Sequence, residues 1–320
     1  MNHHTKGTTM LTARRTVGLA AALTAALALS ACGSADTISG SGDESGGAES
    51  TTITVGSAGF AESEIIAEIY AQALEAQGVT VERTMQIGQR DVYISALEDG
   101  SIDLIPDYSG NLLQYYNSEA DASSSDEVYE ALTEAVPDGF EVLDQSSAED
   151  KDSYNVTKEF SEKHGVTSLA DLADVDEKLV IGGNPELKER PYGPTGLTDV
   201  YGVPAANMSF KPINDSGGPL TVEALRDGTV NVADLFTTSP AIAENGFVTL
   251  DDPENLILPQ NVLPLINSDA ATDEVAETLN AVSAELTTEA LIEMNARNQG
   301  EEKASPATIA KDWLAETGLV

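Results

Sequence analysis

The stretches ISALEDGSIDLIPDY at 94–108 and TVEALRDGTVNVADLF at 221–236 follow one pattern, which decides the fold. In both, a helical segment containing Ala-Leu ends at Asp-Gly, an apolar strand follows, and an aromatic residue stands at the carboxyl end of that strand. Similar units in the two halves of a chain predict two α/β lobes that face a cleft. Because ligands of such sheets bind beyond the carboxyl ends of strands, Tyr108 and Phe236 are candidate ligand contacts.

Other segments around these two units alternate in the same way. Strands are expected where β-branched and apolar residues alternate, and helices where apolar residues recur at helical spacing. The alternation favours an α/β fold with largely parallel sheets. The predicted strands are 51–57, 79–87, 102–108, 141–144, 178–182 and 208–213, and further helices are expected at 62–78, 126–136, 168–173 and 195–201.

The N-terminal region has the features of an export signal. Residues 13–32 read ARRTVGLAAALTAALALSAC, in which two arginines precede an apolar run that ends at a cysteine. The run is about 15 residues long, whereas a membrane-spanning helix needs about 20, so a permanent transmembrane helix is the weaker interpretation. The last four residues, 29–32, resemble a lipobox. We therefore predict a lipoprotein signal peptide over 1–31 and a lipid on Cys32, which anchors the mature protein to the cell membrane outside the cytoplasm.

Cys32 is also the only cysteine in the 320 residues. An intrachain disulfide is thereby excluded, as is any cysteine-based metal site or catalytic dyad in the mature domain. Residues 33–50, GSADTISGSGDESGGAES, are rich in Gly, Ser and acidic residues and lack an apolar period. Such a segment cannot bury enough surface to order itself, so 32–50 is predicted to be a flexible tether.

The chain is strongly acidic, with 54 Asp and Glu against 16 Lys and Arg and a formal net charge of −38. Such a charge repels nucleic acid and anionic lipid headgroups, and it disfavours anionic ligands unless a local basic site compensates. A small cationic or zwitterionic ligand fits better. The alternative, that the acidic residues serve solubility in a salty or cell-surface setting, is compatible with the same composition.

Several blocks of the sequence together resemble a known family. They are GSAGFAESEIIAEIYAQALEAQGVTVER followed by ISALEDGSIDLIPDYSG, then RPYGPTGLTDVYG (190–202), DSGGPLTVEALRDGTVNVADLFTTSPAI (215–242), LDDPENLILPQNVLPLI (250–266) and SPATIAKDWL (305–314). In this order they resemble the osmoprotectant-binding proteins of ABC importers, which bind glycine betaine, carnitine or choline. The resemblance covers essentially all of 51–320.

The resemblance implies a two-lobed type II periplasmic-binding-protein fold with a ligand cleft between the lobes. Lobe 1 is expected to comprise 51–150 plus 250–320 and lobe 2 to comprise 151–249, with crossings near 145–155 and 245–260. It also implies a monomer that needs no cofactor or metal. Its expected partners are a small zwitterionic or cationic solute and the permease and ATPase subunits of the importer.

In this family the quaternary ammonium group is held in a box of aromatic side chains. A trimethylammonium group cannot donate strong hydrogen bonds, so ring faces recognise it, each contributing about 0.5–2 kcal/mol. The resemblance places box positions at Tyr108, with Ser109 beside it, at Tyr154, and at Phe236. Where many relatives have a fourth aromatic residue, this chain has Gln260-Asn261. A polar wall there favours a ligand with polar groups, such as another zwitterion or amine, including an amino-acid derivative or an ergothioneine-like betaine.

Other polar residues have two interpretations each. Ser57, Phe60 and Ser63 lie in or beside the loop that precedes the first helix, where serine hydroxyls meet a polar end of the ligand or simply cap the helix. Thr237 and Thr238 supply donors beside Phe236. Arg190 and Lys211 are scarce positive charges that pair with a ligand carboxylate or form surface ion pairs.

An enzyme needs a nucleophile with a base, or a metal. After the predicted signal only His164 remains among the histidines, and no Gly-x-Ser-x-Gly elbow, phosphate loop or paired-histidine motif occurs. We therefore predict a solute-binding subunit of an ABC importer that catalyses no reaction. A secreted hydrolase and a purely structural surface lipoprotein are the alternatives from other classes.

Overall fold

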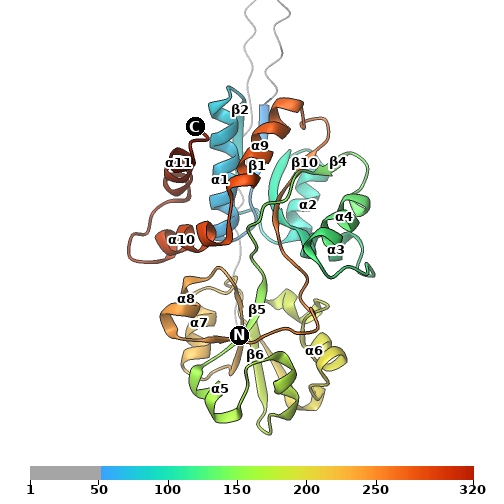
Figure 1. Ribbon diagram of the computed structural model, residues 1–320, viewed down its shortest axis with the longest axis vertical. Coiled ribbons are helices and arrows are strands. Elements are labelled where there is room, and N and C mark those ends of the chain that lie inside the picture. Colours follow the sequence, from blue (N-terminus) through green and yellow to red (C-terminus); the bar gives the residue numbers. More distant parts are fainter. Residues whose placement is uncertain (1–51) are drawn as a thin grey trace, which may run out of the picture. The chain divides into compact units, whose positions relative to one another are not determined.

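Two lobes, each built on a five-stranded sheet, make up the part of the chain that the computed structural model describes, residues 52–320 (Figure 1). Helices cover the sheets, so the predicted two-lobed α/β class is confirmed. The signal peptide, the lipidation at Cys32 and the tether predicted for 1–50 lie outside the described residues.

The sheet of the first lobe has the strand order β2-β1-β3-β10-β4. β1 is parallel to β2 and β3, whereas β10 is antiparallel to β3 and β4. Its strands are β1 (Thr52–Gly56), β2 (Thr80–Thr84), β3 (Leu104–Tyr108), β4 (Phe140–Val142) and β10 (Val262–Asn267).

Apolar clusters join the helices of this lobe to its sheet. One contains the fully buried residues Ile65, Ile66 and Ile69 of α1 and includes residues of α9, α10 and α11; the other joins α2, α3 and α4. Each fully buried isoleucine contributes about 1.5–3 kcal/mol. The helices are α1 (Ala61–Ala76), α2 (Arg90–Glu98), α3 (Ser109–Tyr116), α4 (Ser125–Ala135), α9 (Asp273–Glu285), α10 (Thr288–Gln299) and α11 (Pro306–Thr317).

The sheet of the second lobe has the order β7-β6-β8-β5-β9, with α7 and α8 on one side and α6 on the other in Figure 1. Its strands are β5 (Asp152–Val156), β6 (Leu179–Gly183), β7 (Met208–Pro212), β8 (Val232–Phe236) and β9 (Val248–Thr249). Its helices are α5 (Lys158–His164), α6 (Pro194–Tyr201), α7 (Pro219–Arg226) and α8 (Pro240–Asn245), with 3-10 turns η1 (Leu169–Asp174), η2 (Pro185–Glu189) and η3 (Ala205–Asn207). No helix within residues 52–320 combines the length and apolarity needed to span a membrane.

The sheets are less parallel than the sequence pattern predicts. β6 is parallel to β7 and β8, but β5 pairs antiparallel with β8 and β9, as β10 does with its neighbours. β5 and β10 are the strands by which the chain enters one lobe from the other, so they run against the strands already there. The expected helix at 168–173 is a 3-10 turn, η1, and 152–156, which was expected within a crossing, is the strand β5.

Two connecting segments run between the lobes, one before β5 and one before β10 (Figure 1). They pair with each other: the backbone N–H of Asp150 donates to the carbonyl of Gln260 at 3.1 Å, and that of Val262 donates to the carbonyl of Ala148 at 3.0 Å. Gly110 at the start of α3 lies against the second segment. A Cβ atom there would come within 2.4 Å of the Pro259 carbonyl oxygen, so only glycine allows this approach.

Candidate functional site: a cavity between the two lobes

A cavity lies between the lobes, at the carboxyl ends of β3 and β8. The first lobe lines it from the loop before α1, from α2 and from β3; the second lines it from β8, from the segments that begin β5, and from the turns after β6 and β7. Its volume of about 80 Å³ is several times what one water molecule needs, so it suits a small solute. The lining residues used below are Phe60, Arg90, Tyr93, Tyr108, Asn111, Asp150, Asp152, Glu186, Arg190, Tyr192, Asp234 and Phe236.

Three aromatic rings from both lobes form one wall of the cavity. Phe60 lies between the other two, with ring centroids 6.0 Å from Tyr108 and 5.6 Å from Phe236. Tyr108 ends β3 and Phe236 ends β8, so the two predicted repeats deliver their aromatic residues to the same place. Ring faces at this spacing provide an apolar, cation-attracting surface.

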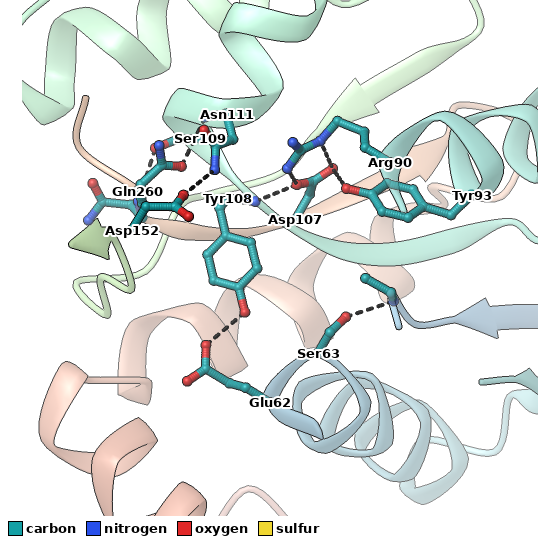
Figure 2. A network of polar contacts seen from close by, with 12 residues as sticks. Glu62, Ser63, Arg90, Tyr93, Asp107, Tyr108, Ser109, Asn111, Asp152 and Gln260 are labelled. Atoms are coloured by element: carbon teal, nitrogen blue, oxygen red, sulfur yellow. Dashed lines mark hydrogen bonds and ion pairs between the residues drawn. The ribbon is translucent and has the colours of Figure 1, made fainter. Parts of the chain in front are cut away.

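A buried ion pair holds the first-lobe part of the wall in place (Figure 2). Asp107, which is fully buried, accepts from the Arg90 guanidinium at 2.6 Å, from the Tyr93 hydroxyl at 2.8 Å and from the backbone N–H of Tyr108 at 2.7 Å. Burial opposes the charge of Arg90, but the adjacent Asp107 outweighs it and raises the guanidinium pKa. Breaking such a pair leaves a buried charge without a partner.

Glu62 at the start of α1 connects the ring of Tyr108 to the second lobe. One carboxylate oxygen accepts from the Tyr108 hydroxyl at 2.7 Å (Figure 2), and the other accepts from Thr238 Oγ1 and Asn295 Nδ2, both at 2.6 Å. Thr238 belongs to the second lobe and Asn295 to α10 of the first. Burial, followed by the nearby Glu62 carboxylate, raises the pKa of the Tyr108 phenol well above its usual value. Tyr108 therefore stays a neutral hydrogen-bond donor.

Further bonds join the lobes on the other side of the cavity. Asn111 Nδ2 on α3 donates to Asp152 Oδ2 on β5 at 3.2 Å (Figure 2), and the Tyr192 hydroxyl lies 2.6 Å from the same oxygen and 3.0 Å from Asn111 Oδ1. The bonds from Asn111 to Asp152 and to Tyr192 cross between the lobes, as the Glu62–Thr238 bond does, whereas the Tyr192–Asp152 bond lies within the second lobe. The bonds that cross are those that an opening of the cleft would break.

Four carboxyl groups lie close together in two pairs. Burial, followed by the charge of Glu62, raises the pKa of Asp150 well above its usual range. The pKa of Asp234 is raised in the same way by burial and then by Asp152. Two carboxyl groups packed this closely cannot both ionise easily, so each pair favours holding a proton or a cation.

Comparisons with known proteins agree with this geometry. Residues 51–316 match the family model described as the substrate-binding domain of the ABC-type glycine betaine transport system. The chain belongs to this family. It is 24% identical to the glycine betaine-binding protein YehZ of Escherichia coli (strain K12), a match that covers 83% of this chain and 90% of that protein. It is 23% identical to the carnitine transport binding protein OpuCC of Listeria monocytogenes, covering 84% and 88%.

Solved structures show the same fold. A glycine betaine/carnitine/choline ABC transporter structure aligns with a TM-score of 0.68 at 20% identity, over 83% of this chain and 99% of that chain. Lactococcal OpuAC in its closed form with glycine betaine aligns with a TM-score of 0.60 at 14% identity, over 83% and 96%. These neighbours confirm the predicted type II periplasmic-binding-protein fold. The chain is thus a substrate-binding component of an ABC transport system.

Among the site residues predicted for this substrate-binding domain, Phe60, Tyr108 and Phe236 line the cavity. The two loop serines brace the backbone instead. Ser63 Oγ accepts from the backbone N–H of Ala58 at 2.9 Å, and Ser57 Oγ accepts from that of Gln86 at 2.8 Å. Neither hydroxyl caps α1, which begins without a side-chain cap; both instead fix the loop that carries Phe60.

The predicted threonines and Ser109 also bind protein groups. Thr237 Oγ1 accepts from the backbone N–H of Lys151 at 2.9 Å, and Thr238 Oγ1 donates to Glu62. Ser109 Oγ accepts from the backbone N–H of Asn261 at 3.0 Å. These residues hold the lobes and crossings together next to the cavity.

The positions expected at Tyr154 and Asn261 do not match their places in the structure. Tyr154 lies in the core of the second lobe at 1% exposure, and its hydroxyl donates to the Tyr192 carbonyl at 2.7 Å. The ring that reaches the cavity from this side is Tyr192. Asn261 faces the first crossing, where its Nδ2 donates to the Ser146 carbonyl at 3.0 Å. Gln260 is fully buried and accepts from the backbone N–H of Asn111 at 2.9 Å, so it supports α3.

The two scarce cations have different surroundings. Arg190 lines the cavity and forms no ion pair within residues 52–320, whereas Lys211 is exposed on β7. The Arg90–Asp107 pair and the carboxyl groups of Asp152 and Asp234 are not predicted from the sequence. For Asp234 a signal was present, because it stands two residues before Phe236 in a strand and therefore shares its face.

Proposed function

We propose that this protein captures a betaine-type or choline-type solute outside the cytoplasm and delivers it to an ABC permease driven by ATPase subunits. The observation that carries the proposal is the cavity itself, which the rings of Phe60, Tyr108 and Phe236 line together with the carboxyl groups of Asp152 and Asp234. A quaternary ammonium group fits such a wall, because ring faces and nearby negative charge attract it without hydrogen bonds. The relatives named above are binding proteins, which supports a role without catalysis.

The opposite end of a zwitterionic solute needs a positive partner. Arg190 meets this need, since it lines the cavity and is not committed to an ion pair in the described part of the chain, whereas Arg90 is committed to Asp107. A guanidinium group can hold a carboxylate with two parallel hydrogen bonds. The proposed pose therefore sets the cation against the aromatic wall and the carboxylate toward Arg190.

Solute binding is proposed to favour the closed arrangement of the lobes. In this proposal, lobe 1 comprises 51–150 and 250–320, lobe 2 comprises 151–249, and the protein acts as a monomer. The two paired crossings act as the hinge, while Asn111–Asp152 and Glu62–Thr238 close the cleft over the solute. The closed form is what the permease recognises.

Calorimetric titration of residues 51–320 with glycine betaine, carnitine and choline tests this proposal. Tyr108→Ala is expected to weaken binding at least tenfold, since it removes a ring face and the anchor on Glu62. The exposed Tyr115→Ala serves as the matched control and should bind like the wild type. Failure of all three solutes to bind, or equal binding by Tyr108→Ala, would refute the proposed site.

The membrane attachment is a separate proposal, which rests on the sequence. Residues 1–31 act as a signal peptide, 32–50 as a tether, and Cys32 carries the lipid. Cells that express the full chain should incorporate labelled fatty acid into the protein and retain it in the membrane fraction. Cys32→Ala should abolish both, and incorporation that persists in this variant would contradict the assignment.

A further inference from the structure

A buried carboxyl group in the second lobe faces the cavity without a donor from the protein. Asp234 on β8 is 4% exposed and lines the cavity, yet within residues 52–320 no N–H or O–H group donates a hydrogen bond to its carboxylate. A second carboxyl group, that of Asp152, lies on the neighbouring strand β5, two residues along from the position opposite Asp234. A carboxyl group that lines the cavity without a protein donor is available to a partner that enters the cavity.

Packing leaves room for this side chain and fixes its direction. β6 runs beside β8, and Gly183 at its end has no side chain; a Cβ atom there would lie 3.0 Å from that of Asp234. On the other side, β5 places Tyr154 opposite Asp234 and Asp152 opposite Phe236. Residues two apart on a strand share a face, so the carboxyl group and the Phe236 ring belong to one surface.

The groups around Asp234 are mostly acidic. Asp152 and Tyr154 face it from β5, Glu186 from η2, and Asp150 from the crossing. Burial and then the negative charge of Asp152 raise the pKa of Asp234 well above its usual value. A carboxyl group with a raised pKa and another acid beside it holds its proton more readily, and a cation that takes the place of that proton relieves the repulsion.

The positive groups of the cavity do not neutralise this pair. Arg90 is bound to Asp107, and Arg190 acts on the phenols of Tyr93 and Tyr192, whose pKa it lowers against the dominant effect of burial. The phenol of Tyr192 also senses the negative charge of Asp234. The negative side of the cavity therefore lacks a counter-charge from the protein.

We propose that Asp234 is a specificity-determining residue that binds the cationic group of the solute and that this cation displaces a proton from the Asp234 carboxyl group. The inference rests on the proposed function, because it needs a solute in the same cavity. The exchange balances: one cation enters, one proton leaves Asp234 for the solvent, and the Asp234 carboxylate then carries the charge that pairs with the cation. Solutes without a positive charge are rejected, since they would leave the proton in place and gain nothing from the carboxyl pair.

Proton displacement makes binding depend on pH with a definite sign. Below the raised pKa of Asp234, the proton on its carboxyl group competes with the cation. Each unit by which the pH rises weakens this competition, so the affinity for the solute increases up to about tenfold per unit. Above that pKa the dependence levels off. Between about pH 5 and about pH 8, the affinity for choline and for glycine betaine is thus expected to increase.

Calorimetry in two buffers of different ionisation enthalpy, repeated across this pH range, counts the protons released per bound solute. The wild-type domain should release about one proton on binding choline or glycine betaine. Asp234→Asn should release almost no protons on binding, and its affinity for the solute should be nearly constant across this pH range. Its affinity should come closest to that of the wild type at low pH. Asp121→Asn, which removes a charge from an exposed position, should behave like the wild type.

The outcomes separate the inference from the proposed function. Binding by the wild type without proton release, or an unchanged proton count in Asp234→Asn, overturns the role of Asp234 while the solute site stands. Absence of binding by every solute at every pH overturns both. Circular dichroism checks the fold of the variant. If Asp234→Asn does not fold, the number of protons that the wild type releases and the same measurement on Asp152→Asn decide whether the cation displaces a proton here.

Discussion

The ends of β3 and β8 were built from the same sequence pattern but are stabilised in opposite ways. Their beginnings match: the side chain of Asp103 accepts from the backbone N–H of Thr54 at 2.8 Å, and that of Asn231 accepts from the backbone N–H of Val180 at 2.7 Å. Their carboxyl ends differ. In the first lobe the charge of Asp107 has three donors, whereas in the second lobe Asp234 faces the cavity with another acid beside it.

The two repeats therefore contribute differently to the cavity. Alignment at Asp-Gly sets Pro106 of the first repeat against Asp234 of the second, and both line the cavity. The first lobe thus offers a rigid wall whose polar groups are already satisfied. The second offers unsatisfied charge, which a ligand can satisfy. Such unfavourable groups are typical of functional sites, where stability is given up for binding.

The largest expected effect on stability comes from breaking the buried ion pair of the first lobe. Arg90→Ala should lower the free energy of unfolding by about 3–5 kcal/mol, because Asp107 remains buried without its counter-charge. Urea denaturation measures the loss. Arg226→Ala, in the second repeat, removes an exposed pair with Glu223 and should cost at most about 1 kcal/mol. Equal losses in the two variants would contradict the contrast.

A smaller effect on stability, which depends on pH, is expected from Asp234 in the second lobe. The pKa of Asp234 is higher in the folded than in the unfolded chain, so its stabilising contribution is complete below the unfolded pKa and is lost as pH rises through the folded pKa. Without ligand, Asp234→Asn should therefore match the wild type near pH 4 and exceed it near pH 8, by up to about 1.4 kcal/mol per unit of pKa shift.

Thermal melts of the two proteins across this pH range measure the difference. Some pH dependence should remain in the variant, because Asp150 also has a raised pKa. Identical melting temperatures of variant and wild type at every pH would contradict a raised pKa of Asp234 in the folded protein.

The smallest effect concerns the matching beginnings of the strands. Asp103→Ala and Asn231→Ala should each lower the free energy of unfolding by about 1–2 kcal/mol, since each removes a partly buried side chain that satisfies a backbone N–H group. Solute affinity should not change, because neither residue lines the cavity. A loss of binding in only one variant, measured by the same titration, would show that the repeats are not equivalent here.

Much of the fold was predictable because its signals are local. The helix of 61–76 follows from the spacing of its isoleucines, and the repeated Asp-Gly boundary placed β3 and β8 correctly. The strand β5 was missed because DSYNV has little apolar content, and pairing with β8 decides its conformation. The family resemblance placed Tyr154 in the aromatic box, but in the structure its ring packs in the second-lobe core and its hydroxyl donates to the Tyr192 carbonyl, which only tertiary packing decides.

The sequence by itself determined the lobes, their order along the chain, and two aromatic residues at the ends of equivalent strands, since periodicity and turn residues act over a few neighbours. The tertiary structure alone decided which charges are paired. Arg90 and Asp107 lie 17 residues apart on the successive elements α2 and β3, whereas Asp152 and Asp234 come from the antiparallel strands β5 and β8; in both cases the packing of elements brings the charges together. Burying an unpaired charge is costly, and contact with an opposite charge offsets that cost. Whether such a contact forms depends on how separate elements pack against each other, which local sequence patterns do not specify.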